Sequence, residues 1–318
     1  MGKRIIIASI VFALGIVMQG ASSASLSYLF EGARPMAMGG AFVAVVDDPN
    51  AIFYNPAGLG FLKKAEISTS FAQLLRDANY YKIAFYYSLG DYGTMAIGGD
   101  QVNLEPFPIT SINENGTPEI VGTGSFTNRI LLLSFSTRIS EDLSIGINLK
   151  KYDEYFEGVS FSGSGIGNTI GLLYKPIKWL SLGVNLEDYL NGKCVFEDSG
   201  NSIEQKIPTS LLLGFSARPI NNLIVAGDVI KNDLARDDSN NLLFKGGAEI
   251  NIYDWMFLRL GYQKSNYEVN SQVASIKTAG LGFVLLNSIK MDYAYTWTRY
   301  VQVVGDRESH YLSLGTKF

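Results

Sequence analysis

The chain has 318 residues and a formal net charge of −4. Nucleic-acid-binding proteins usually present a basic face, so this balance argues against a nucleic-acid partner. The single cysteine excludes an intrachain disulfide. The 47% share of hydrophobic residues, together with 33 Gly, 18 Tyr and 18 Phe, favours many short strands over helices. Aromatic residues prefer strands and glycine weakens helix interiors.

The N-terminus has the three parts of a secretory signal. Lys3 and Arg4 carry the positive charge, residues 5–18 form an apolar run, and residues 22–24 are small. A single membrane anchor is the less favoured alternative, because the run is shorter than the roughly 18 apolar residues that a spanning helix needs. We therefore predict that residues 1–24 are a cleavable signal peptide and that the protein is exported.

Residues 65–318 alternate between apolar and small or polar side chains. Leu143, Ile145 and Ile147 face one way, for example, while the residues between them face the other. About 14 such segments can be counted, at about 66–73, 79–89, 93–103, 125–138, 142–153, 163–175, 178–189, 206–218, 221–231, 241–252, 255–266, 271–286, 288–300 and 308–318. The connections between them alternate between short turns and longer polar loops, and the longer loops are expected at about 104–124, 154–162, 190–205, 232–240 and 301–307.

An even strand number, a short/long loop rhythm and a terminal Phe318 are typical of a bacterial outer-membrane barrel. A soluble sandwich or propeller explains the alternation and the turns, but not these features together with an export signal. We predict an all-β fold, a transmembrane antiparallel β-barrel of about 14 strands over residues 65–318, located in the cell outer membrane.

Residues 25–64 break this rhythm and are small, apolar and nearly uncharged. About 40 residues cannot bury a core of their own, so the segment must pack against something larger. A barrel of this width would otherwise enclose an open lumen, and we predict that the segment fills it as a hatch. Asp47-Asp48-Pro49-Asn50 and Asn55-Pro56-Ala57-Gly58 are turn signals within it.

The stretch Gly32-Ala33-Arg34…Met38-Gly39-Gly40-Ala41-Phe42-Val43-Ala44…Asp47-Asp48-Pro49…Tyr54-Asn55-Pro56-Ala57-Gly58-Leu59 resembles the N-terminal signature of the FadL superfamily. It is similar in particular to the PorV/PorQ-type branch. The resemblance implies a 14-stranded barrel plugged by an N-terminal hatch, whose Asn-Pro-Ala motif is matched here by Asn55, Pro56 and Ala57. FadL-like members carry fatty acids or aromatic hydrocarbons, whereas PorV-like members resemble shuttle components of protein secretion.

We therefore expect a monomeric barrel that contacts outer-membrane lipid and passes small hydrophobic molecules passively, with such a ligand or detergent in its lumen. The alternative is a PorV-like barrel without a channel, which would bind secretion-system or surface proteins. The residues expected to form the hatch and gate are Gly39, Gly40, Asp47, Asp48, Asn55, Pro56 and Ala57. Gly98 and Gly99 are expected to kink the third strand into a lateral opening, unless they simply accommodate the hatch.

The sequence offers little for catalysis. Hydrolytic barrels pair a nucleophile with a base, and the chain has one histidine, His310, and one cysteine, Cys194. We expect no enzymatic activity, cofactor or resident metal. The acidic pair Asp237-Asp238 has oxygen ligands suited to weak calcium binding, but a solvated loop is the favoured interpretation.

Overall fold

The computed structural model describes residues 32–74, 78–113, 116–158, 161–190, 192–198, 201–235, 242–265, 273–286, 288–300 and 307–318. The predicted signal peptide at residues 1–24 and the acidic pair at Asp237-Asp238 lie outside these ranges. The first seven residues of the predicted hatch, 25–31, also lie outside them.

The described residues form one antiparallel sheet of 16 strands. The strands are β1 (Ala65–Leu74), β2 (Ala78–Ser88), β3 (Thr94–Ile112), β4 (Pro118–Arg138), β5 (Leu143–Glu157), β6 (Phe161–Ile177), β7 (Leu180–Glu187), β8 (Lys193–Asp198), β9 (Asn201–Lys206), β10 (Ser210–Ile220), β11 (Leu223–Lys231), β12 (Leu242–Tyr253), β13 (Met256–Ser265), β14 (Val273–Leu285), β15 (Ile289–Tyr300) and β16 (Arg307–Lys317).

The sheet closes on itself. β1 pairs with β16, with Glu66 opposite Lys317, and β5 pairs with β6 to complete the circle. β8 and β9 form a hairpin attached to β6 alone, so 14 strands make up the ring. This confirms the predicted 14-stranded antiparallel barrel. Closure leaves no unpaired sheet edge around the ring.

The two faces of the wall differ as the alternation predicts. On β4 and β5 the outward side chains are Leu131, Leu133, Ile147 and Leu149, each about half exposed, whereas the inward Ser134 and Asn148 are buried. Similar outward apolar side chains occur on β2, β3, β7, β10 and β16. An apolar surface that encircles the molecule is far larger than a soluble monomer tolerates, and it suits a hydrocarbon surrounding.

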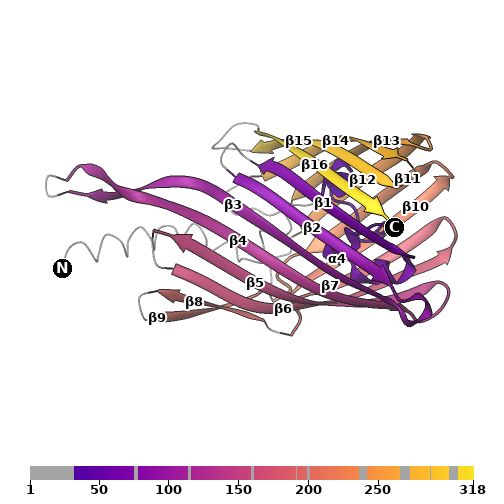
Figure 1. Cartoon of the computed structure of the whole chain (residues 1–318), viewed down its shortest axis with the longest axis horizontal. Coiled ribbons are helices and arrows are strands. Elements are labelled where there is room, and N and C mark those ends of the chain that lie inside the picture. The colour runs from indigo at the N-terminus through magenta and orange to yellow at the C-terminus, as the bar shows by residue number, and fades with distance from the viewer. Residues whose placement is uncertain are drawn as a thin grey trace.

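The two ends of the barrel are unlike. One end, here called the turn end, carries Phe318 and short connections, including residues 139–142 and 178–179 (Figure 1). The other end, here called the loop end, carries the longer connections between β11 and β12, β13 and β14, and β15 and β16, together with short connections at 75–77 and 158–160. There β3 and β4 continue well past the ring as a two-stranded arm that reaches Ile112 and Pro118.

Three predicted loops are therefore wrong. The segment 154–162 is predicted to be a loop, but β5 continues to Glu157 and β6 begins at Phe161. The segment 104–124 was expected to be a loop, but most of it extends β3 and β4. The segment 190–205 was also expected to be a loop, but it contains the hairpin β8–β9. The two halves of the arm pair with each other, and β8 pairs with the part of β6 that rises above β7. These backbone pairings, which are not visible in the sequence, decide against loop structure.

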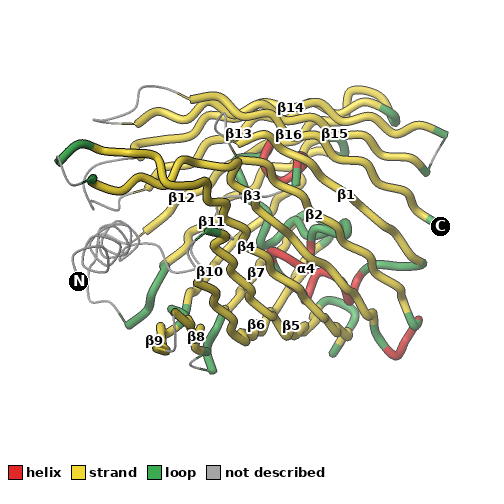
Figure 2. Tube along the Cα trace, turned by 60° about the vertical axis from the view of Figure 1, so that its left-hand side comes forward, coloured by secondary structure: helices red, strands yellow, loops and turns green. Residues whose placement is uncertain are grey.

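Residues 32–64, which we call the luminal segment, lie inside the ring of strands (Figure 2). The segment contains the short helices α3 (Ala33–Ala37) and α4 (Ala51–Tyr54) and the 3₁₀ helix η1 (Pro56–Phe61). A further short 3₁₀ helix, η2 (Gly90–Tyr92), lies in the turn after β2. No helix among the described residues is long and apolar enough to cross a membrane.

Candidate ligand pocket in the lumen

The luminal segment is held against the wall by close backbone packing. Gly39 adopts a left-handed φ of 65°, and a Cβ there would lie 2.5 Å from the backbone nitrogen of Tyr262. The wall contributes its own glycines: a Cβ on Gly247 would overlap the carbonyl of Met38, and one on Gly261 would overlap the nitrogen of Gly39. Glycine on both sides lets the two backbones touch.

A network of ion pairs joins the luminal segment to the wall. The Arg34 guanidinium contacts Glu249 of β12 through two hydrogen bonds, of 2.8 and 2.9 Å, and contacts Asp47 at 2.6 Å and Asp48 at 2.8 Å. Arg259 of β13 also pairs with Glu249. Bidentate arginine–carboxylate pairs are stronger than single contacts.

The charges in this network stabilise one another. Burial alone would lower the pKa of Arg34, but Asp47, Glu249 and Asp48 outweigh it and raise that pKa well above its usual value. Burial alone would raise the pKa of Asp48, but the Arg34 guanidinium holds it below the ordinary 3.8. Both groups are therefore ionised near neutral pH.

The Asn-Pro-Ala motif fixes a second point of the segment. The Asn55 amide donates to the backbone carbonyls of Val43, at 3.1 Å, and of Leu172 in β6, at 3.0 Å. Its oxygen accepts from the Ala57 N–H at 3.1 Å and so caps η1, where Pro56 occupies the first turn. Asn caps and N-terminal prolines suit such a helix start.

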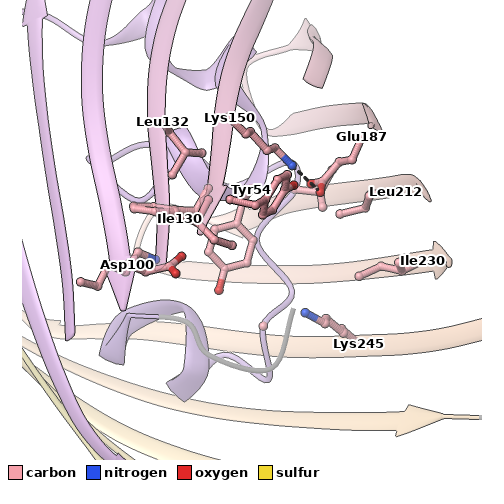
Figure 3. Close-up of a pocket in the computed structure, with 14 residues that line it drawn as sticks. Tyr54, Asp100, Ile130, Leu132, Lys150, Glu187, Leu212, Ile230 and Lys245 are labelled. Atoms are coloured by element: carbon pink, nitrogen blue, oxygen red, sulfur yellow. Dashed lines mark hydrogen bonds and ion pairs between the residues drawn. The ribbon is translucent and has the colours of Figure 1, made fainter. Parts of the chain in front are cut away.

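A pocket lies between the luminal segment and the wall, toward the loop end (Figure 3). Gly40, Val43, Phe53 and Tyr54 of the luminal segment form one side. The wall contributes apolar side chains from four strands, namely Ile130 and Leu132 of β4, Tyr152 of β5, Leu212 of β10 and Ile230 of β11. The wall also contributes the charged side chains of Lys82, Asp100, Lys150, Glu187 and Lys245.

The charged groups are arranged around the aromatic rings. Lys150 pairs with Glu187 at 2.9 Å, and the Nζ of Lys82 lies 3.8 Å from the centroid of the Phe53 ring. Phe42 packs against Tyr54 with 5.2 Å between ring centroids. Cation–π contact of this kind stabilises an ammonium group that has lost water. The pocket is thus lined by apolar side chains and by five charged ones, two of which form an ion pair.

The space in the pocket is small. The volume open to the centres of water molecules is about 40 Å³, which is room for roughly three waters. A ligand as large as an aromatic ring therefore requires movement of the luminal segment or of the side chains that line the pocket. Because Phe53 and Tyr54 belong to the luminal segment, a shift of that segment enlarges the pocket directly.

The residues predicted to form the hatch and gate fall into two groups. Of the seven, Gly40 is the one found among the described residues that line the pocket. Gly39, Asp47, Asp48, Asn55, Pro56 and Ala57 instead attach the luminal segment to the wall or to itself. These six residues set the position of the segment rather than contact the pocket space.

The kink predicted at Gly98 and Gly99 is absent from the structure. Both residues remain paired on both sides, with Gly98 between Ala84 and Leu132, and Gly99 between Ile83 and Leu131. A Cβ on Gly98 would lie 3.1 Å from the Phe53 ring. The lack of a side chain at Gly98 therefore makes room for the luminal segment, and the predicted lateral opening is wrong for this conformation.

Most residues that line the pocket were not predicted from the sequence, although one pattern in the sequence indicates an apolar lumen. Ile130-Leu131-Leu132-Leu133 interrupts the alternation, which forces apolar side chains onto both faces of β4. The same holds for Leu211-Leu212-Leu213 in β10. An apolar run within a barrel strand marks where the lumen is apolar. The inward lysines carry no comparable pattern.

His310 lies on the outer face of β16, where its Nδ1 is 2.8 Å from the Tyr293 hydroxyl. The neighbouring Ser309 belongs to the opposite face, because successive strand residues alternate. The two side chains thus form no nucleophile–base pair. His310 instead contacts the rings of Tyr293 and Tyr295.

Several solved structures have a similar backbone arrangement. The toluene transporter TbuX of Ralstonia pickettii is similar over 90% of this chain and 98% of its own, with a TM-score of 0.66 and 15% identity. The CymD monoaromatic hydrocarbon channel is similar over 92% of this chain and 98% of its own, with a TM-score of 0.67 and 14% identity. A FadL homologue of Pseudomonas aeruginosa is similar over 91% of this chain and 98% of its own, with a TM-score of 0.61 and 12% identity.

The chain has the FadL-type barrel fold. No protein-family model matches the sequence, and no curated protein matches it either. The likeness lies in the arrangement of the backbone, since identities of 12–15% leave few shared side chains. Fold likeness alone does not determine function, so the function must be argued from the pocket itself.

Proposed function

We propose that the protein is an exported outer-membrane barrel that passes small hydrophobic molecules inward without energy input. The observation that carries this proposal is the pocket in the lumen, which Tyr54 of the luminal segment lines together with Ile130 and Leu132 of the wall (Figure 3). An apolar pocket with a few polar groups is the usual form of a site for a small hydrophobic ligand. The ring of outward apolar side chains supports membrane insertion.

In this proposal the ligand enters from the loop end and occupies the pocket, and the luminal segment acts as a hatch that shifts to release it toward the turn end. Burial of about 150 Å² of aromatic surface at about 25 cal/mol per Å² gives roughly 4 kcal/mol. That corresponds to a dissociation constant near 1 mM, which is weak enough for rapid release. Passive flux needs such weak binding.

The direct test is uptake by intact cells of a host that lacks its own hydrocarbon and fatty-acid channels. Cells that express the full chain should take up radiolabelled toluene or oleate faster than cells with an empty vector. The amount of barrel in the outer-membrane fraction serves as the control for expression. Equal uptake rates in the two strains, with folded barrel present, would contradict the proposal.

The alternative of a secretion shuttle has no specific observation in its favour. None of the three similar structures is a secretion component. Copurification of secretion proteins with a barrel that gives no uptake would favour the shuttle.

A further inference from the structure

Three cationic side chains lie on three consecutive strands of the outer wall near the loop end. They are Lys264 on β13, Lys277 on β14 and Arg299 on β15, and all three are exposed. In the strand register Arg299 is opposite Ser275, so Lys277 lies two residues nearer the turn end. Their neighbours Gln263 and Thr278 are buried in the lumen, so the alternation directs the cations outward. We call Lys264, Lys277 and Arg299 the cationic face.

The aromatic residues around these cations locate them at the edge of the apolar band. Lys277 lies between Tyr262 and Trp297 in the strand register, with its Nζ 5.0 Å from the Trp297 ring. Toward the turn end the outward residues become apolar, as at Leu260 and Leu281. Tyrosine and tryptophan gather where the hydrocarbon of a membrane meets its headgroups, and a lysine on the outer wall is tolerated at that level.

Two other exposed lysines near the loop end have acidic partners. Lys151 pairs with Asp153 at 3.3 Å, and Lys193 pairs with Glu204. None of the ion pairs found within the described ranges includes Lys264, Lys277 or Arg299. The adjoining strand β16 carries one outward acidic residue among its described positions, Glu308, which is opposite Trp297 of β15. The cationic face therefore keeps an excess of positive charge.

We propose that the cationic face binds the phosphate groups of an anionic glycolipid in the outer leaflet. The three strands span about 10 Å, so a headgroup with two phosphates can contact more than one cation at once. The acyl chains of such a lipid would lie along Leu260 and Leu281. A free phosphate ion gains the charge contacts but not this apolar burial, which is why the lipid is favoured. The inference rests on the proposed membrane location but not on hydrocarbon transport.

The test is titration of the detergent-purified full chain with diphosphoryl lipid A, with bound lipid counted by native mass spectrometry. The variant K264Q/K277Q/R299Q removes the cationic face. Each charge near a membrane surface contributes about a fivefold gain in affinity, so the triple variant should bind about a hundredfold more weakly. The matched control K151Q/K193Q removes two exposed lysines that already have acidic partners, and its affinity should stay within about twofold.

Equal weakening of the triple variant and the control would overturn the proposal, as would failure of the unmodified chain to bind. Displacement of lipid A by millimolar inorganic phosphate would show an ion site rather than a lipid site, and would also overturn it. Retention of heat-modifiable migration on gels shows that the triple variant folds. If it does not fold, K277Q alone should give about fivefold weaker binding. Uptake of toluene, measured separately, tests the proposed transport, so the two proposals can fail independently.

Discussion

Arg34 and Glu249, which are 215 residues apart in the chain, form a bidentate pair with contacts of 2.8 and 2.9 Å. Arg34 belongs to the luminal segment and Glu249 to the wall. A single guanidinium thus ties the segment to β12 while also compensating Asp47 and Asp48. Removal of one partner from a buried network of this kind leaves uncompensated charge in a place that water reaches poorly.

Arg34→Met is therefore expected to destabilise the attachment of the luminal segment by about 3–5 kcal/mol, because Asp48 and Glu249 lose their shared partner. Limited proteolysis of the detergent-purified barrel should show faster cleavage within the segment. The matched control is Arg138→Met, since Arg138 makes a 3.9 Å pair with a fully exposed Asp91. Exposed pairs contribute about 0–1 kcal/mol, so the control should be cleaved like the unmodified chain.

The attachment should also depend on acid. The pKa of Asp48 is held below its ordinary 3.8, so its ionised form stabilises the folded state above the unfolded value of about 3.9. That contribution is lost as pH falls through the lower folded pKa. Protease resistance of the segment should stay constant from pH 7 to pH 5 and decline below about pH 4. Asp48→Asn should flatten the part of the decline that Asp48 causes, and an unchanged profile in this variant would refute the assignment.

Two adjacent glycines in β12 give a matched pair for the close backbone packing. A Cβ on Gly247 would overlap the Met38 carbonyl, whereas a Cβ on Gly246 would meet nothing within 4 Å. Gly247→Ala should lower the unfolding free energy by about 1–3 kcal/mol through overpacking. Gly246→Ala should change it little. The temperature at which the barrel loses its compact migration on gels measures both. Equal shifts in the two variants would argue against the backbone contact.

The pocket can be tested by exchanging adjacent residues of β4. Leu132 lines the pocket and is buried, while Leu133 points outward and is 52% exposed. Leu132→Asn should slow toluene uptake several-fold, because an apolar contact of about 1–2 kcal/mol to the bound ring is lost. Leu133→Asn should leave the uptake rate per folded barrel unchanged, although a polar side chain on the lipid face lowers the amount of barrel assembled. The pocket assignment fails if the outward change slows uptake as much as the inward one.

The barrel was largely predictable because its determinants are local. The period-two alternation of Leu143, Ile145 and Ile147 reports the two faces of a strand directly. The turns at residues 139–142 and 178–179 are short, so the strands that they connect must pair as antiparallel neighbours. The strand count and the closure follow from these features, since each strand needs a partner on both sides.

The site was less predictable because it depends on contacts between distant residues. Nothing in the sequence pairs Arg34 with Glu249 or places Phe53 against Gly98. The glycine at position 98 was read as a kink, although its role is to make room for a ring from the luminal segment. The hairpin β8–β9 was missed for a similar reason, because its pairing with β6 depends on how far β6 rises above the ring.

The seam between β1 and β16 has a consequence for assembly. The Phe318 amide donates to the Ala65 carbonyl at 2.9 Å, so the first and last residues of the wall meet each other. The ring cannot close until β16, the last strand of the ring in chain order, has been synthesised and delivered. Residues 32–64 precede every strand of the ring in the sequence. They must therefore already lie between the strands when β1 and β16 pair, or enter the closed barrel afterwards. The pairing of β1 with β16 therefore determines when the luminal segment must be enclosed.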